Sequence, residues 1–134
     1  MLIEALVAIL LFTLGIVAVM GLQANSIAQV SQTKYRIDAS YLANQIIGKM
    51  WVDQAVPADL VAYATPGSAG RAAWDNVVAA TLPSGAATIT VVGPVGSPGL
   101  GGNTVTVTIT WKQPEDIVTR RYVAVANINP SLSP

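Results

Sequence analysis

One carboxylate stands near the start of a long apolar segment, and its position is the chemical feature that most needs an explanation. Glu4 is the only ionisable side chain before Lys34, and every residue from Ala5 to Leu22 is apolar, glycine or threonine. A carboxylate inside hydrocarbon must be neutralised or paired. The nearest cation in the sequence is the α-amino group of Met1. We therefore interpret Glu4 as a functional residue that needs a partner, with the Met1 amine as the candidate cation; the alternative is an ordinary anchor whose first turn lies among headgroups.

No set of residues with recognisable catalytic or metal-binding chemistry is present. The 134 residues include neither histidine nor cysteine, which removes the usual general base, the commonest metal ligands and any disulfide framework. A Ser–Lys pair stays open, although nothing in the sequence points to one. Glu115 and Asp116 fit no calcium-binding template, and the Gly-rich stretch 96–102 lacks the lysine and strand-to-helix context of a phosphate loop. We predict no enzyme activity, no cofactor and no metal site.

The charge balance argues against a nucleic-acid partner. Only 10% of the residues are charged, and the formal net charge is zero, so no overall potential attracts an acidic polymer. Lys112, Arg120 and Arg121 could gather at one end of a sheet, where we interpret them as a solvated strand end. No partner can be inferred for three aspartates: Asp53, Asp59 and Asp75.

The apolar segment is long enough to cross a bilayer as a helix. At about 1.5 Å per residue, Ala5 to Leu22 approaches the roughly 30 Å of a bilayer core. Its eleven Leu, Ile, Val and Phe residues favour insertion by about 3 to 7 kcal/mol, against about 3 kcal/mol for one buried acid. Residues 1–24 are therefore predicted to be a transmembrane helix. Nothing basic precedes it, so we expect that a leader has been removed or that Met1 marks where the chain was cut.

The helical pattern continues beyond the apolar segment. Because no proline occurs before Pro57, we predict one continuous helix to about Asp53, roughly 80 Å long. Gly15 and Gly21 weaken it locally by about 1 kcal/mol each relative to alanine, and we interpret them as sites of close helix packing or local unwinding. Apolar residues at helical spacing predict a buried face in the second half of the helix: Ile27, Val30, Ile37, Leu42, Ile46 and Met50.

The residues after the apolar segment predict a small α+β head at 25–134. Its first part, 25–53, is the amphipathic half of the long helix. Residues 54–85 are expected to form a loop anchored by Leu60 and Tyr63 and then a short helix over 68–80. Residues 86–129 are expected to form a three-stranded antiparallel meander with strands at 87–92, 104–111 and 119–127. The middle strand alternates valine or isoleucine with threonine, so its threonine face should be exposed. Core positions are predicted for three tryptophans: Trp51, Trp74 and Trp111.

Several stretches resemble the type IV pilin superfamily, and within it the PilV-type minor pilins. The general resemblance is the Leu2-Ile3-Glu4 start, the uninterrupted apolar helix and the small head ending in a meander. The narrower resemblance is AAWDNVVAATLPSG, TVTVTITWKQP and RRYVAVANI, in this order. The chain departs from the family in three ways. Its glutamate lies one residue closer to the start, and it has no C-terminal disulfide. Its first helix also lacks the proline that many family members carry, and Gly21 stands near that position.

The resemblance implies a type IV pilus subunit. Such a protein is cleaved by a prepilin peptidase, often N-methylated, stored in the bacterial inner membrane and built by an assembly platform into an extracellular filament of pilin subunits. In that setting, the amine of an incoming subunit can meet Glu4 of a subunit already in place. The Gly93 to Asn103 loop and the threonine face are candidate lateral contacts. The alternatives are a type II secretion pseudopilin and a signal-anchored periplasmic protein with a binding or enzymatic head.

Overall fold

The computed structural model describes residues 1–53, 57–93, 102–114 and 116–129, without the side chains of residues 24, 25, 28 and 57–59. These residues divide into two units, 1–35 and 36–134. Each unit is described by itself.

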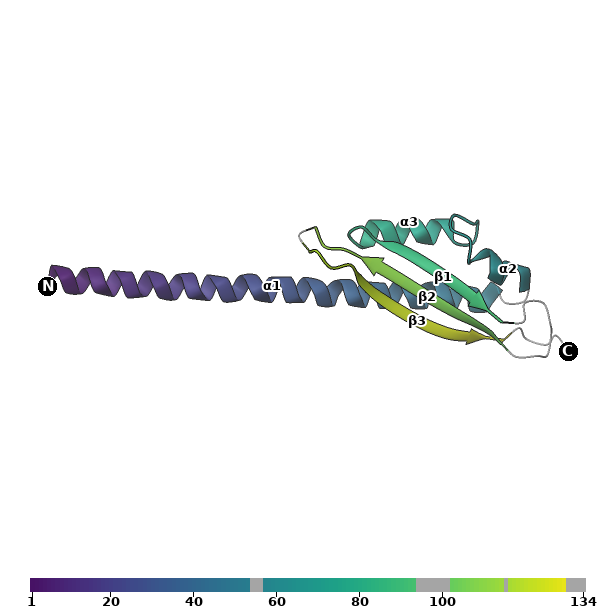
Figure 1. The fold of residues 1–134 in the computed structure, drawn as a ribbon, viewed down its shortest axis with the longest axis horizontal. Coiled ribbons are helices and arrows are strands. Elements are labelled where there is room, and N and C mark those ends of the chain that lie inside the picture. The colour runs from purple at the N-terminus through teal and green to yellow at the C-terminus, as the bar shows by residue number, and fades with distance from the viewer. Residues whose placement is uncertain (54–56, 94–101, 115, 130–134) are drawn as a thin grey trace. The chain divides into compact units, whose positions relative to one another are not determined.

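The first unit is the N-terminal part of one long helix. Helix α1 runs without interruption from Leu2 to Asp53, as the absence of proline predicts (Figure 1). Within it, Leu2–Gln23 is long and apolar enough to cross a membrane, with a mean hydropathy of 2.7 and none of its surface buried. The predicted apolar N-terminal helix is therefore confirmed. Gly15 and Gly21 both lie inside the helix.

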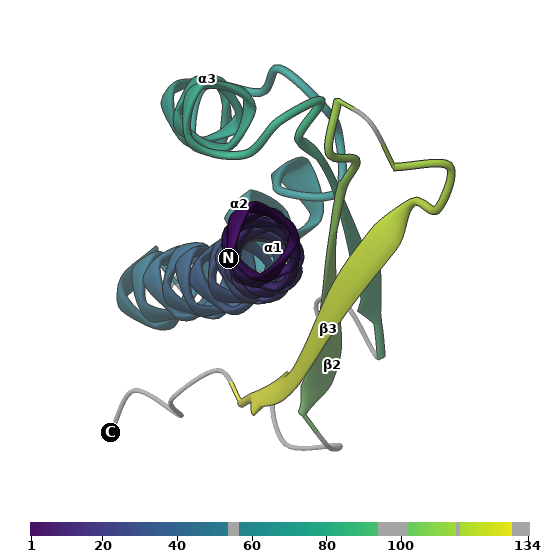
Figure 2. The same cartoon turned by 90° about the vertical axis from the view of Figure 1, so that its left-hand side faces the viewer.

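The second unit combines the C-terminal part of α1, residues 36–53, with two further helices and a sheet. The helices are α2, Pro57–Ala62, and α3, Ala72–Thr81. The strands are β1, Ala86–Val92, β2, Asn103–Trp111, and β3, Arg120–Ile128, which form an antiparallel sheet in the order β1-β2-β3. Figure 2 shows α3 and the C-terminal part of α1 on the same side of this sheet. The α+β architecture and the meander match the prediction.

The core of the second unit follows from the alternation in β2. Successive side chains of a strand point to opposite faces, so Val105, Val107, Ile109 and Trp111 are buried while the intervening threonines lie on the other face. The buried residues of α1 recur at helical spacing and supply the opposite wall: Ala39, Leu42, Ala43, Ile46 and Met50. Trp74 and Val78 of α3 also lie in the core.

Two helix predictions need correction. The expected loop after Pro57 contains α2, because proline has the backbone angle of a first helical residue and needs no hydrogen-bond partner there. Leu60 and Tyr63 are nevertheless buried, as predicted. Helix α3 begins at Ala72 rather than Ser68, since the preceding residues form a turn in which the Arg71 amide donates to the Ser68 carbonyl at 2.9 Å.

The predicted buried face of α1 was too wide. Trp51 is 43% exposed, because it follows Met50 by one residue and so lies about 100° around the helix from the buried stripe. Ile37 also points away from that stripe and is 62% exposed. Ile27 and Val30 are exposed as well and belong to the first unit, where α1 is the single described element.

Candidate functional site

The N-terminal surface of α1 is the first candidate site. We define the apolar rod as Leu2–Gln23. Every residue of the rod is exposed in the isolated chain, including Phe12 at 71%. Apolar area of this extent has a strong tendency to leave water, at about 25 cal/mol for each Å² removed. Burial of the rod against lipid or other protein would therefore be favourable.

Glu4 lies in the first turn of α1, where a negative charge interacts favourably with the helix dipole. The Ala5 amide donates to the Met1 carbonyl at 3.2 Å, so Met1 and Glu4 occupy the same helical turn. No ion pair joins the Glu4 carboxylate to the Met1 amine in the described part of the chain. Within the residues described, both charges are thus available to a second molecule.

Thr13 does not compete with Glu4 as a polar site in the rod. It is the one polar side chain between Glu4 and Gln23, and its Oγ1 donates to the Leu10 carbonyl at 2.8 Å. A hydroxyl that is satisfied inside its own helix needs no external partner in an apolar environment. Glu4 is therefore the one charged side chain of the rod, and its burial would demand a partner.

Gly15 and Gly21 are the points where another helix can approach the rod most closely. A Cβ added at either glycine would meet nothing within 4 Å. At Gly15, an open groove lies among large apolar side chains: Leu11, Phe12, Ile16, Val19 and Met20. Small residues of this kind let helix backbones come close in apolar surroundings. The packing role of both glycines stays a prediction.

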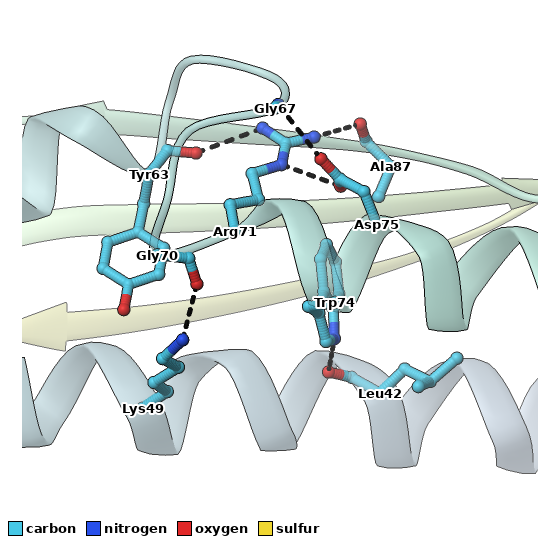
Figure 3. A network of polar contacts seen from close by, with 9 residues as sticks. All are labelled: Leu42, Lys49, Tyr63, Gly67, Gly70, Arg71, Trp74, Asp75 and Ala87. Atoms are coloured by element: carbon cyan, nitrogen blue, oxygen red, sulfur yellow. Dashed lines mark hydrogen bonds and ion pairs between the residues drawn. The ribbon is translucent and has the colours of Figure 1, made fainter.

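A buried arginine positions the second unit, and the sequence analysis did not identify it. Arg71 is only 1% exposed. Its Nη1 donates to the Tyr63 carbonyl at 3.1 Å and its Nη2 to the Ala87 carbonyl at 2.6 Å, while its Nε donates to Asp75 at 2.9 Å (Figure 3). These contacts tie the residues after α2, helix α3 and strand β1 together. The i, i+4 spacing of Arg71 and Asp75 was the sequence signal that could have revealed the pair.

Within the second unit, polar contacts also fasten the segments after α1 to the C-terminal part of α1. Trp74 Nε1 donates to the Leu42 carbonyl at 3.0 Å, and Lys49 Nζ donates to the Gly70 carbonyl at 2.7 Å. Tyr63 donates its hydroxyl to Asp53. Two of the three aspartates for which no partner was inferred therefore have one, Asp53 and Asp75; the side chain of Asp59 lies outside the described residues.

The three basic residues that could gather at one end of the sheet are placed near that end by the strand register. Arg120 and Arg121 lie opposite Trp111 and Thr110 at one end of the sheet, close in sequence to Lys112. Arg120 is already paired, because its Nη2 lies 2.8 Å from Asp116 Oδ2.

The carboxyl of Asp116 is held in its charged form by its neighbours. The Val118 amide donates to it at 3.1 Å, and together with Arg120 this lowers the pKa of Asp116 below its ordinary value.

In the described part of the chain, no group of three His, Cys, Asp or Glu side chains could hold a metal ion. Glu115, and residues 94–101 of the predicted contact loop, lie outside the described residues.

No family model, curated protein or solved structure matches this chain. The fold and the candidate site instead define a class by architecture. It is an α+β protein whose N-terminal helix exposes a membrane-length apolar rod with one carboxylate in its first turn.

Proposed function

We propose that this protein is a type IV pilus subunit, of the minor-pilin kind, that is held in the bacterial inner membrane and enters a helical filament through α1. The observation that carries the proposal is the fully exposed apolar rod with a carboxylate in its first turn that has no ion-pair partner among the described residues. The resemblance of the first residues and of the three C-terminal stretches to minor pilins supports it. The head then serves as a spacer and a contact surface.

The physical basis of assembly is an exchange of surroundings for the rod. In the membrane, the rod is covered by lipid chains, and in a filament it is covered by the rods of other subunits. Both environments are apolar, so little hydrophobic driving force is lost in the transfer. A pair between Glu4 of one subunit and the terminal amine of the next would fix the axial register, which is the best-attested role of buried polar pairs.

The two alternatives make different demands on the rod. A type II secretion pseudopilin would use the same rod and carboxylate, and incorporation into a pseudopilus rather than a pilus would identify it. A signal-anchored binding protein would need the rod only as an anchor, so Glu4 would be dispensable and the head would carry the activity.

Replacing Glu4 tests the proposal in cells that assemble type IV pili. We expect the Glu4→Ala variant to insert into the membrane as the parent does, because removing the acid lowers the cost of insertion. We expect its amount in sheared filaments to fall strongly, because the pair with an incoming amine is lost. Quantitative immunoblotting of membrane and sheared fractions measures both effects.

Two further variants make the comparison specific. Glu4→Gln keeps the size and polarity but removes the charge, so it should also fail to enter filaments. Asp38→Asn removes a carboxylate from the same helix beyond the rod and should leave incorporation unchanged. Normal incorporation of both Glu4 variants would overturn the proposed role of the carboxylate.

A further inference from the structure

The connection between β2 and β3 carries two exposed aliphatic side chains. Ile117 is 94% exposed and Val118 is 58% exposed. We call these two residues the tip. Among the large apolar residues of the second unit that the structure describes, Ile117 is the most exposed. Adjacent apolar side chains that the fold leaves in water can mark a surface that contacts another molecule or a membrane.

Basic residues stand on both sides of the tip in the sequence. Lys112 and Arg121 are exposed, and neither forms an ion pair within the described residues. Arg120 lies 2.8 Å from the Asp116 carboxylate and balances its charge. The sequence of the connection, 112–121, has three cations and two acids, so its formal net charge is +1. The connection therefore combines an apolar tip with a small excess of positive charge.

Two contacts give the direction of α3 relative to the part of α1 in the second unit. Gly70, just before α3, accepts from Lys49 of α1 at 2.7 Å. Trp74, further along the chain, donates to the carbonyl of Leu42 at 3.0 Å. Later residues of α3 thus meet earlier residues of α1, so the two helices run antiparallel (Figure 3). The C-terminal end of α3 therefore lies toward Arg36, where α1 enters the unit.

The connection between β2 and β3 lies at this same end of the second unit. Its Lys112 amide donates at 2.9 Å to the carbonyl of Pro83, which follows closely after the last residue of α3. Figure 1 shows the connection projecting beyond that end of α3. We call the end of the second unit that contains Arg36 and this connection the entry end.

A short segment joins the entry end to the rod. The rod ends at Gln23 and the second unit begins at Arg36, and α1 is helical across the residues between them. At about 1.5 Å per residue, residues 24–35 span about 18 Å. A rod inserted in a bilayer therefore keeps the entry end close to the lipid headgroups, where the short tether makes even weak interactions effective.

We propose that the tip enters the headgroup region of the bilayer that holds the rod, with Lys112 and Arg121 beside anionic lipid headgroups. The inference rests on the membrane storage in the proposed function, to which it adds a second point of contact with the same bilayer. Insertion removes the apolar area of Ile117 and Val118 from water. The two cations are attracted by the negative surface potential of anionic lipids.

A lipid surface fits the tip better than a protein surface does. A specific protein interface buries roughly 800 Å² on each partner, whereas the tip consists of two aliphatic side chains. A bilayer requires no complementary shape, and its anionic headgroups complement the net charge of +1 of the connection. The bilayer is also present beside the entry end whenever the rod is inserted. These observations together favour lipid as the partner of the tip.

Fluorescence quenching in nanodiscs that each hold one full chain tests this contact. The natural chain has no cysteine, so Thr119→Cys can carry a single environment-sensitive label beside an intact tip. The nanodiscs contain phosphatidylglycerol and phosphatidylcholine, with a quencher on the acyl chains near the headgroups. We expect the label to be quenched and its emission to shift to shorter wavelength.

Val52→Cys provides the control position. Val52 is 80% exposed and lies near the C-terminal end of α1, away from the entry end. Its label should stay in water and escape the quencher. Equal quenching at the two positions would overturn the proposal. Quenching at Thr119→Cys that appears only when two chains share a nanodisc would overturn it too, because it would identify a second copy as the partner.

Two double variants of the labelled Thr119→Cys chain test the tip itself. I117T/V118T replaces both aliphatic side chains of the tip and should lose most of the quenching. V123T/V125T replaces two other exposed apolar residues, which are 45% and 64% exposed on β3, and should keep it. Circular dichroism checks that both variants are folded. An equal loss of quenching in the two variants would contradict the role of the tip.

A change of lipid charge tests the two cations. In anionic nanodiscs, K112Q/R121Q should lower the ratio of inserted to free tip by up to about 30-fold, because two cations near an anionic surface are lost. In nanodiscs of phosphatidylcholine alone, the same variant should differ little from the parent chain. Equal quenching of the parent and the variant in anionic nanodiscs would overturn anionic lipid as the partner.

The failure of this inference can be distinguished from the failure of the proposed function. A label at Thr119→Cys that stays in water, in a chain embedded in the nanodisc, overturns the tip contact but not the filament entry that depends on Glu4. Normal filament entry of the Glu4 variants overturns the assembly role of the carboxylate, whereas the label beside the tip would still be quenched.

Discussion

Arg71 shows how one side chain can hold several segments of a small domain in place. Its guanidinium carries its charge in a position that is 1% exposed, with three acceptors from different parts of the chain around it. Burying a charge is costly unless hydrogen bonds replace its hydration. The arginine therefore acts as a structural residue. Its loss would remove one donor from the carbonyls of Tyr63 and Ala87 and from the Asp75 carboxylate, which also accepts from the Gly67 amide at 3.4 Å.

We predict that Arg71→Met lowers the free energy of unfolding by about 3 to 5 kcal/mol, because removing one partner of a buried charged network strands the others. The measurement is chemical denaturation of the full chain in detergent. Arg36→Met, which replaces an exposed arginine of α1, is the control and should change stability by less than about 0.5 kcal/mol. Equal effects of the two substitutions would contradict the role assigned to Arg71.

The lowered pKa of Asp116 makes part of the folding stability dependent on pH in the acid range. The Val118 amide and Arg120 lower the pKa of Asp116 from 3.8 in the folded protein. The unfolded chain therefore binds this proton at a higher pH than the folded chain does. The stability contributed by Asp116 is fully present above about pH 3.8 and is lost as the pH falls through the lowered folded pKa. We expect Asp116→Asn to remove this part of the pH dependence, measured as unfolding midpoints between neutral and acidic pH.

At the scale of the elements, glycine can be replaced at one position in α1 but is required at another between α3 and β1. A Cβ added to Gly48, inside α1, meets nothing within 4 Å. A Cβ added to Gly85, before β1, would lie 2.6 Å from the Val78 carbonyl and 2.9 Å from that of Leu82. Glycine is therefore replaceable in the helix, whereas the connection from α3 to β1 requires it.

We predict that Gly48→Ala raises the free energy of unfolding by about 0.5 to 1 kcal/mol, since alanine restricts the unfolded chain and favours the helix. Gly85→Ala should lower it by more than about 1 kcal/mol, since backbone oxygens must move to admit the methyl group. Thermal unfolding of the detergent-solubilised chain, followed by circular dichroism, compares the two. The interpretation is wrong if the two substitutions shift stability in the same direction.

At the scale of the whole molecule, the proposed function assigns filament assembly to the rod, whereas the head is a spacer and a contact surface. A chimera in which residues 1–24 are replaced by a leucine- and alanine-rich transmembrane helix separates anchoring from assembly. We predict that the chimera remains in the membrane, because length and hydropathy suffice for insertion. It should be absent from sheared filaments, because it lacks Glu4 and the glycine positions of the rod. Filament entry equal to that of the parent chain would show that the rod is only an anchor.

Local patterns account for what could be predicted from the sequence. The apolar run predicted the rod, and the absence of proline before Pro57 predicted an uninterrupted α1. The alternation of valine or isoleucine with threonine predicted the two faces of β2. These features repeat with the period of a helix or a strand, so residues near in sequence suffice to recognise them.

Contacts between distant residues account for the rest. The sequence marked Trp51 as a core residue, but the buried stripe of α1 is set by where the sheet and α3 pack, which leaves Trp51 exposed. The partners of Arg71 lie on segments up to Ala87, and no periodicity links them. The place of β3 at the edge of the described sheet likewise follows from the strand order. Such features depend on which surfaces meet in space, and that is decided by packing of the whole second unit rather than by local periodicity.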